Sequence, residues 1–574
     1  MKNLFRNIVV TCFVIVFTFA PASNFAGTTG KISGTVKDAD TNEPLPGCNI
    51  VIEGTDLGAA TNVDGQFVIL NITPGIYTVR ASMIGYKNYI ISNVHIVADF
   101  TTQLEYLMEA QILEMDEEIV VTAERELIRK DETSKVAIVS SEEILNMPVR
   151  TLQGILTTKA GFTTDANGDL HVRGGRTGEL AYMVDGVKME DPLYGEYSET
   201  FNKDAINEMV IISGTFNAEY GDAMSGIVNI ITRDGGDAFH GRLEYTSPML
   251  NNSPYRSSNP FPGVEDESEY TETSVYDRSV VYMLGTLRGS FEGPIFSNLT
   301  FFLSGFVSNE DSYLPHGYSL ARDGFGKITY FASPTLKLAL SGQISQSENQ
   351  GYSHRWKYLS QNQTHSTINT NRQVLMLTHT INSNLFYIVN ISRFENGLKV
   401  QVQDKLPSEY EIGKTGETVY FYVQGDDSRY ADNQTVTYRG IVDATFQANN
   451  YHQFKTGLQL VSHNINVYEE VDPWPSGAQF KDDYTKEPFE FAAYIQDKIE
   501  YDYLIVNVGL RYDYVDPKAT MWPDINRFGY FDENNNWILA EEVEVEPKTQ
   551  FSPRIGLAHP ITEDAVLHFA YGHF

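Results

Sequence analysis

Cysteine is nearly absent from this 574-residue chain, which contains only Cys12 and Cys48. Cys12 lies within an apolar run at residues 8–20, which follows a basic start and precedes small residues, the pattern of a secretory signal peptide. Removal of that peptide, residues 1–26, leaves Cys48 as the single thiol of an exported chain. The sequence therefore excludes an intrachain disulfide, even in an oxidising compartment.

Long apolar runs and an excess of basic residues are also missing. After the signal peptide, no apolar stretch reaches the roughly 20 residues that a membrane-spanning helix needs, so the exported chain is either soluble or enters a membrane as a β-barrel. The net charge is −33, and it becomes −35 when Lys2 and Arg6 leave with the signal peptide. This charge argues against nucleic acid as a partner. Solvated acidic loops explain it more simply than calcium binding does.

Recognisable catalytic and metal-binding motifs are missing as well. No histidine is followed at the third position by the glutamate that zinc carboxypeptidases use, and no Gly-x-Ser-x-Gly sequence marks a nucleophile. The segment from Asp165 to Asp169 looks like the start of a calcium loop but lacks the later glutamate that an EF-hand requires. We therefore expect no catalytic residue, no metal site, no cofactor and no enzyme activity.

Residues 27–110, by contrast, alternate apolar and polar positions with period two, and turns separate the alternating segments. This pattern predicts a small all-β sandwich. The block resembles the carboxypeptidase regulatory-like domain, and the resemblance implies an accessory module that brings no peptidase activity with it. The motifs that carry the resemblance are Gly34-Thr-Val-Lys37, Thr61-Asn-Val-Asp-Gly-Gln-Phe67, Pro74-Gly-Ile-Tyr-Thr-Val79 and Gly85-Tyr86.

Residues 111–134 form a polar and acidic connector, which we expect to be a flexible linker. Within it lies a strand-prone segment without proline and without an obvious partner strand nearby. A strand-former on a tether can pair with the sheet edge of another protein. The plainer interpretation, an ordinary strand of the domain that follows, stays open at this point. The segment consists of Ile119, Val120, Val121, Thr122 and Ala123.

Residues 135–236 mix helix and strand signals. Ser140 with Glu143 predicts a capping box at the start of a short helix, and Asp185-Gly186 between apolar neighbours predicts a type I′ hairpin. Five motifs here resemble, in order and spacing, the plug domain of TonB-dependent outer-membrane receptors, with wording closer to the Oar-like branch than to the starch-utilisation branch. They are His171-Val-Arg-Gly-Gly-Arg176, Tyr182-Met-Val-Asp-Gly-Val187, Ile206-Asn-Glu-Met-Val-Ile-Ile-Ser-Gly214, Glu219-Tyr-Gly221 and Gly226-Ile-Val-Asn-Ile-Ile-Thr232.

From residue 237 to 574, alternating segments are joined by connections that switch between short and long, as periplasmic turns and extracellular loops do in an outer-membrane barrel. A soluble sandwich with the same period is the less favoured alternative. We count roughly thirteen strands, whereas a plugged transporter barrel has about 22, so we expect an incomplete barrel that stops inside a strand. The predicted fold is thus mainly β: an N-terminal β-sandwich, an α/β plug domain and part of an antiparallel transmembrane β-barrel.

The resemblance to TonB-dependent receptors implies a location, partners and a partner-binding site. It implies a protein of the outer membrane, in contact with lipid, that imports a small ligand such as a siderophore, a glycan or a peptide. It also implies recruitment by TonB, which is driven by an inner-membrane energising complex and adds a strand to the TonB box ahead of the plug. The residues that match this box are Ile119, Val120, Val121, Thr122 and Ala123.

Arg173 and Arg176 are the candidate ligand contacts in the plug. The alternative is that these arginines pair with acidic residues of the barrel wall, while Gly174 and Gly175 between them permit a tight turn. Two other functions also fit the resemblance. An Oar-like adhesion or structural protein would keep its plug closed and would not depend on TonB. A transcription-signalling transducer would carry a mixed helix and strand domain before the box, which the all-β pattern of residues 27–110 argues against.

Overall fold

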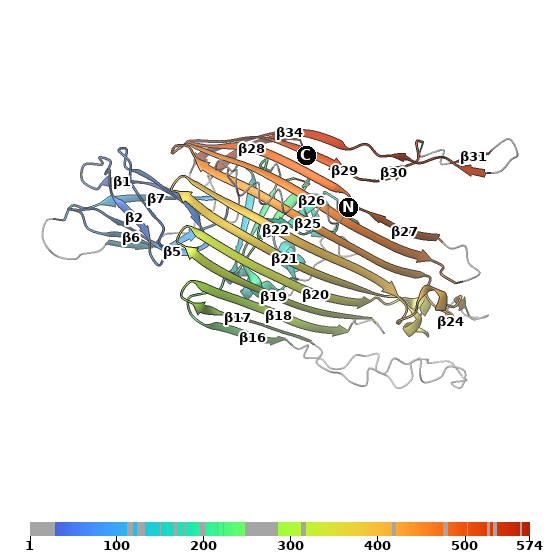
Figure 1. Ribbon diagram of the computed structural model, residues 1–574. Coiled ribbons are helices and arrows are strands. Elements are labelled where there is room, and N and C mark those ends of the chain that lie inside the picture. The colour runs from blue at the N-terminus through green and yellow to red at the C-terminus, as the bar shows by residue number, and fades with distance from the viewer. Residues whose placement is uncertain are drawn as a thin grey trace.

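The computed structural model describes most of the chain beyond residue 28 (Figure 1). The predicted signal peptide and Ala123 lie outside the described residues. No helix within these residues is long and apolar enough to cross a membrane. The described residues are 29–111, 119–122, 133–149, 151–165, 170–176, 178–195, 201–214, 216–221, 223–246, 285–311, 317–356, 358–415, 421–474, 480–501, 503–524, 529–531, 537–562 and 565–573.

The N-terminal part is a β-sandwich, as its alternating pattern predicts. Its sheets have the strand orders β4-β1-β7 and β3-β2-β5-β6-β8. The faces between them bury Ile32, Ile50, Val79 and Tyr106 completely, which accounts for the period of two along each strand. The strands are β1 (Gly30–Asp38), β2 (Asn49–Ile52), β3 (Gly58–Ala60), β4 (Gln66–Ile72), β5 (Gly75–Ser82), β6 (Tyr89–Ile96), β7 (Thr101–Met108) and β8 (Ile119–Thr122).

Strand β8 contains four residues of the predicted TonB box, and it is not a free strand. It pairs in parallel with β6, where Tyr89 lies opposite Ile119 and Ile91 lies opposite Val121. The Ile119 amide also donates to the Asn88 carbonyl at 2.9 Å. The expectation of an unpartnered strand on a flexible linker is therefore wrong for these residues. The reason is that β6 would otherwise end its sheet with an unpaired row of backbone groups, and β8 satisfies that row.

Cys48 is fully buried in the sandwich, where its Sγ lies 3.4 Å from the Met108 Sδ. Burial raises the pKa of the Cys48 thiol to about 11. Compared with an ordinary thiol of pKa 9.0, the folded chain should hold roughly 100-fold less thiolate at pH 8, because each pKa unit is a factor of ten. We expect iodoacetamide to label Cys48 only after denaturation, as measured by mass spectrometry. Equal labelling rates in the folded and the denatured chain would contradict the burial of Cys48 in the sandwich.

The plug domain is a small sheet with short helices against it. Ser140 caps α2 by accepting a hydrogen bond from the Glu143 amide at 3.4 Å, which is one of the two bonds of the predicted capping box. Asp185 and Gly186 have φ values of 50° and 77°, which are the left-handed conformations that a type I′ turn requires. The sheet order is β13-β12-β15-β14-β9, with a separate β10-β11 pair. The elements are β9 (Lys135–Ser140), α2 (Ser141–Asn146), α3 (Leu152–Thr157), β10 (Phe162–Thr164), β11 (Leu170–Val172), β12 (Leu180–Val184), β13 (Val187–Lys188), η1 (Lys203–Ala205), β14 (Ile206–Ser213) and β15 (Gly226–Thr232).

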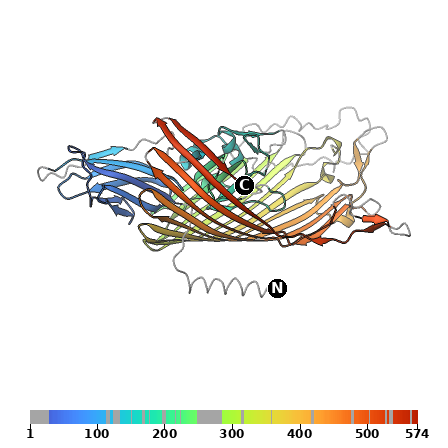
Figure 2. The ribbon, with the colours of Figure 1, turned by 90° about the horizontal axis from the view of Figure 1, so that it is seen from above.

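The remaining strands form one long antiparallel sheet that curves around the plug (Figure 2). Within the described residues its main path has thirteen strands, as predicted, and β27 pairs with β26 beside that path. Strands β16 and β35 end the path and are not paired with each other, so the sheet is not closed. The strands are β16 (His240–Thr246), β17 (Gly285–Phe296), β18 (Leu299–Asp311), β19 (Tyr318–Ser333), β20 (Leu336–Gln350), β21 (His365–Asn382), β22 (Leu385–Gln401), β25 (Arg429–Gln447), β26 (His452–Val471), β27 (Phe480–Lys486), β28 (Phe489–Tyr501), β29 (Leu504–Asp516), β34 (Lys548–Thr562) and β35 (Ala565–Gly572).

Side chains of the barrel wall alternate between an outer face and a plug-facing side. On β28, Ile495 is 55% exposed on the outer face, whereas the next residue, Gln496, is buried and donates to Glu219 of the plug at 3.3 Å. This agrees with the predicted lipid face and polar lumen face. The short turns all lie at one end of the wall, beside the sandwich, and the long connections lie at the other end (Figure 1).

The long connections carry small elements of their own. Asp426, fully buried in the connection between β22 and β25, is held by Lys405 at 2.6 and 2.8 Å. The elements are η3 (His354–Trp356), η4 (Ser360–Asn362), η5 (Pro407–Glu409), β23 (Lys414–Thr415), β24 (Tyr422–Gln424), β30 (Thr520–Met521), β31 (Gly529–Phe531), β32 (Trp537–Leu539) and β33 (Val543–Glu544).

Candidate functional site: the plug, the wall and the docked sandwich

Lys327 of β19 forms the most deeply buried ionic contact between wall and plug. Its Nζ lies 2.7 Å from Asp234, 3.4 Å from Asp185 and 2.9 Å from the Thr232 hydroxyl. Asp185 also accepts hydrogen bonds from the Thr232 amide at 2.9 Å and from its hydroxyl at 2.6 Å. Lys337 of β20 forms a second ion pair with Asp234. One wall cation therefore ties the predicted Asp185-Gly186 hairpin to the end of β15.

Lys455 of β26 joins all three parts of the protein. Its Nζ contacts Asp99, in the turn between β6 and β7 of the sandwich, at 2.7 Å. It also contacts Glu219 of the plug at 3.1 Å, and Gln496 of β28 donates to the same carboxylate. One buried lysine of the wall thus neutralises a carboxylate of the sandwich and a carboxylate of the plug.

Three wall arginines donate to backbone carbonyls of the plug. Arg554 reaches Asn217 at 2.6 Å and Tyr220 at 2.5 Å. Arg511 reaches Glu219 at 3.2 Å. A third, on β25, completes the set: Arg439 donates to the Lys188 carbonyl at 2.6 Å. In these contacts the wall supplies the cations and the plug supplies carboxylates and carbonyls, whereas Arg233 of the plug and Glu292 of β17 form an ion pair of the opposite direction at 3.6 Å.

The predicted pairing of Arg173 and Arg176 with acidic wall residues is wrong for the described residues, although another plug arginine, Arg233, does lie 3.6 Å from Glu292 of β17. Arg173 and Arg176 are both exposed, and neither forms an ion pair with a described residue. Arg173 and Gly174 have φ values of 50° and 78°, so the predicted tight turn is present at this position. No hydrogen bond or ion pair joins β8 to either arginine within the described ranges. Ligand contact by Arg173 and Arg176 stays a prediction.

The sandwich is seated in the mouth of the wall at the end with short turns (Figures 1 and 2). Leu70 of β4 is buried against a cluster that includes Phe386 and Ile388 of β22. Lys31 of β1 forms a buried ion pair with Glu500 at the end of β28, with side-chain exposures of 6% and 11%. An apolar contact and a buried ion pair together hold this domain against the barrel.

The predicted TonB box lies on the outer edge of the docked sandwich. Val120 and Val121 are 62% and 41% exposed, and β8 ends its sheet. The Ser92 hydroxyl of β6 donates to the Val121 carbonyl at 3.3 Å, which adds a side-chain contact to the parallel ladder. The backbone edge of β8 that faces away from β6 has no strand partner within the described residues.

The wall cations were missed by sequence reasoning, although a signal for them exists. The chain has 42 basic and 75 acidic residues, so a basic residue on the plug-facing side of a barrel strand is unexpected. Lys327 lies between Gly326 and Ile328, and its own strand pattern assigns it to the inner face. A search for basic residues at inner-face positions would have found Lys327, Lys455 and Arg511.

A β-barrel wall curves around a plug domain that it holds by ion pairs and hydrogen bonds. This architecture defines the class of outer-membrane β-barrels that carry a plug. Family models agree in every part: a CarboxypepD_reg-like domain matches residues 32–121, a TonB-dependent receptor plug domain matches residues 129–227, and a TonB-dependent receptor-like β-barrel matches residues 290–573. The chain belongs to the family of TonB-dependent receptors, which lie in the outer membrane and are generally not enzymes. The first match ends at residue 121, inside β8, as the strand pairing suggests.

Curated relatives match only part of their length. The TonB-dependent transporter Oar of Myxococcus xanthus is 24% identical over 300 residues, 49% of this chain and 27% of that protein. The TonB-dependent receptor P39 of Formosa agariphila is 29% identical over 241 residues, 40% of this chain and 22% of that protein. The chain thus spans about a quarter of the length of these relatives.

Among solved structures, the unliganded ferric citrate transporter FecA shares the fold, with a TM-score of 0.54, 12% identity, and coverage of 77% of this chain and 63% of that chain. The FpvAI–pyocin S2 complex gives a TM-score of 0.53 at 11% identity, covering 77% of this chain and 56% of that chain. At these identities the similarity shows the fold alone.

Proposed function

We propose that this protein is an energised importer that moves a small ligand through its barrel when TonB pulls on β8. The observation that carries the proposal is the position of β8: a strand directly ahead of the plug, at the end of its sheet, with an open backbone edge. TonB can add a strand to that edge through main-chain hydrogen bonds. The ligand is unidentified, and siderophores, glycans and peptides are the candidate classes.

The contacts between plug and wall suit a plug domain that must be held in the barrel and then displaced during import. They consist of ion pairs and of hydrogen bonds to carbonyls, such as Lys455 with Glu219 and Arg554 with Asn217, and water can replace such bonds one at a time. A cavity of about 60 Å³ between plug and wall, lined by Asn229, Asn390 and Asp443 among others, has room for water. An apolar interface of the same area has no hydrogen bonds that water can replace one at a time.

A photo-crosslinker placed at Thr122 tests the proposal. We expect it to capture TonB in energised cells and to lose most of the product when a protonophore collapses the inner-membrane gradient, because the proposed importer requires TonB to reach β8 in its energised state. The measurement is the yield of crosslinked product on an immunoblot. A crosslinker at Val63, an exposed residue of the sandwich outside β8, is the control and should give no product.

The alternative function is an adhesion or structural protein of Oar-like type whose plug stays closed. The sandwich seated in the barrel mouth favours it, because Lys31 and Leu70 hold a folded domain across the route of import. Under this alternative the Thr122 crosslinker gives no TonB product, or a product that the protonophore leaves unchanged. Either result would overturn energised import.

A further inference from the structure

The outer face of the wall becomes more polar toward the long connections, although Val307 and Ile344 remain exposed apolar residues there. Leu340, Leu375 and Ile391 lie opposite one another on β20, β21 and β22, and Leu460 continues the row on β26 through Gly440 of β25. All four apolar side chains are more than 40% exposed. Exposed apolar side chains on the outside of an outer-membrane barrel face lipid, so this row belongs to the lipid-facing band.

Polar residues replace the apolar ones in the next rows toward the long loops. Gln373 and Arg393 lie opposite each other, followed by Asn371 opposite Glu395. The following row places Asn369 opposite Gln346 on one side and Gly397 on the other. These side chains point outward, because the residues between them, such as Thr370, Arg372 and Asn396, are buried on the plug side.

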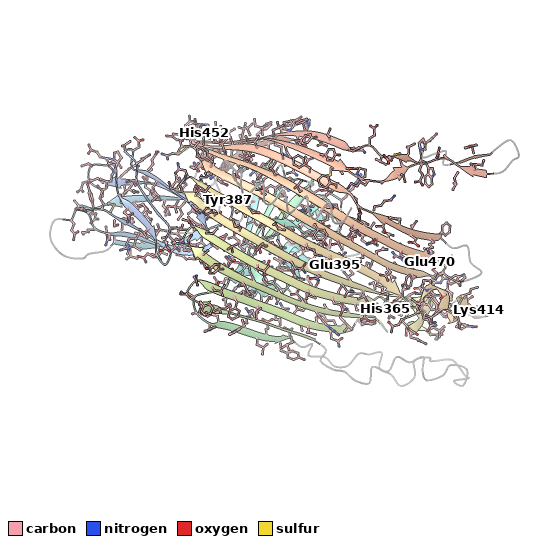
Figure 3. The ribbon with its side chains drawn as sticks, in the orientation of Figure 1. His365, Tyr387, Glu395, Lys414, His452 and Glu470 are labelled. Atoms are coloured by element: carbon pink, nitrogen blue, oxygen red, sulfur yellow. The ribbon has the colours of Figure 1, made fainter. Side chains whose placement is uncertain are left out.

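A groove of about 850 Å³ lies in this polar region, with Glu395 visible on the outer side of the wall (Figure 3). Gly324 and Gly397 leave it open, and Ile344, which is 68% exposed, gives it an apolar floor. Its polar groups are held in place by one another. The Gln346 amide donates to Asn369 at 2.9 Å, and Gln434 donates to Glu395 at 2.6 Å.

We propose that this groove binds a saccharide carried by a lipid of the outer leaflet. Amide and carboxylate groups around an exposed Ile344 match a sugar ring, which has hydroxyl groups at its edge and an apolar C–H face. Acidic residues outnumber basic ones in the lining, with Asp323, Glu395 and Asp432 against Arg322 and Lys399, which favours neutral sugars over phosphate groups. Because the groove borders the lipid-facing row, a headgroup attached to a membrane lipid reaches it directly.

Filling the groove tests the proposal without disturbing the wall. A Cβ at Gly397 meets only the carbonyl oxygens of Asn433 and Asn369, at 3.8 and 3.9 Å, so Gly397→Trp fits the strand and fills the groove. Gly440 is the matched control, because a Cβ there meets nothing within 4 Å and the residue lies outside the groove. The protein is placed in nanodiscs of phospholipid with or without a neutral glycolipid, a diacylglycerol that carries one hexose, and the glycolipid that stays bound after washing is quantified by mass spectrometry.

We expect the wild type and Gly440→Trp to retain the neutral glycolipid, and Gly397→Trp to retain about tenfold less. A tenfold loss corresponds to roughly 1.4 kcal/mol of binding free energy. Addition of the delipidated saccharide alone should not displace the bound glycolipid at equal concentration. Equal retention by all three proteins would overturn the proposal. Retention of phospholipid in place of glycolipid would overturn it too, as would displacement by the free saccharide, which would assign the groove to a soluble sugar. The test does not depend on TonB, so it stands apart from the proposed import.

Discussion

Val121→Pro is expected to abolish energised uptake and TonB crosslinking while leaving the barrel in the outer membrane. Proline has no backbone N–H and fixes φ, so it removes one bond from any ladder that uses this residue and distorts the adjacent positions. In β8 the lost amide is one that faces β6, as the Ile119 amide does, so the expected effect on the open edge comes from distortion of this four-residue strand. The measurement is the yield of the crosslink between TonB and the Thr122 crosslinker in energised cells. This yield should fall to the level seen in cells that were not irradiated.

Two matched variants separate the backbone pairing of β8 with TonB from effects of the Val121 side chain and from effects of the contact between β8 and β6. Val121→Thr keeps the β-branched shape and the backbone N–H, so it should retain crosslinking close to the wild-type level. Ser92→Ala removes only the side-chain bond from β6 to the Val121 carbonyl, so it should also retain crosslinking. Normal TonB capture by Val121→Pro would remove β8 from the mechanism. Loss of capture in Val121→Thr would show that side chains, not backbone bonds, are recognised.

Lys327→Met is expected to loosen the plug strongly. The substitution leaves Asp185 buried without a cation and leaves Asp234 with Lys337 alone. Removal of one partner from a buried ion pair typically costs about 3–5 kcal/mol, because the remaining charge is left uncompensated. The measurement is the urea concentration at which the plug of the detergent-solubilised protein becomes sensitive to protease, and it should fall markedly.

Two further variants locate the effect at this contact. Lys399→Met removes a lysine from the outer face of the wall and should leave the urea midpoint unchanged. Asp185→Asn combined with Lys327→Met removes both charges and should recover part of the lost stability, since the uncompensated carboxylate is gone. An unchanged midpoint in Lys327→Met would show that the contact does not hold the plug.

Local chemistry made some of the architecture predictable. The Asp185-Gly186 turn forms as expected, because a type I′ turn depends on two adjacent residues with positive φ. The faces of β28 follow from the period of two around Ile495 and Gln496. These features need no knowledge of distant parts of the chain, so a single sequence is enough to find them.

Contacts between distant segments were not predictable in the same way. The hairpin at Asp185 was expected, but its partner Lys327 lies 142 residues further along the chain. Likewise, Ile119 to Thr122 form a strand as predicted, but their pairing with β6 is parallel and skips β7. Periodicity assigns a residue to a face, whereas the neighbour across that face depends on how the domains dock. The pairing of Arg173 and Arg176 with the wall was therefore misjudged, and the wall lysines that bind plug carboxylates were not foreseen.

The ladder between β8 and β6 is short, so it is the part of the sandwich that we expect to separate first when the chain is pulled at β8. It has four register pairs, whereas the parallel ladder between β1 and β7 in the same sandwich has eight. A force applied to Thr122 opens the four-residue ladder from one end while the longer ladder still bears load. The rest of the sandwich then stays folded and stays docked at the mouth of the barrel. If TonB pulls on β8 as proposed, this strand leaves β6 before the rest of the sandwich unfolds.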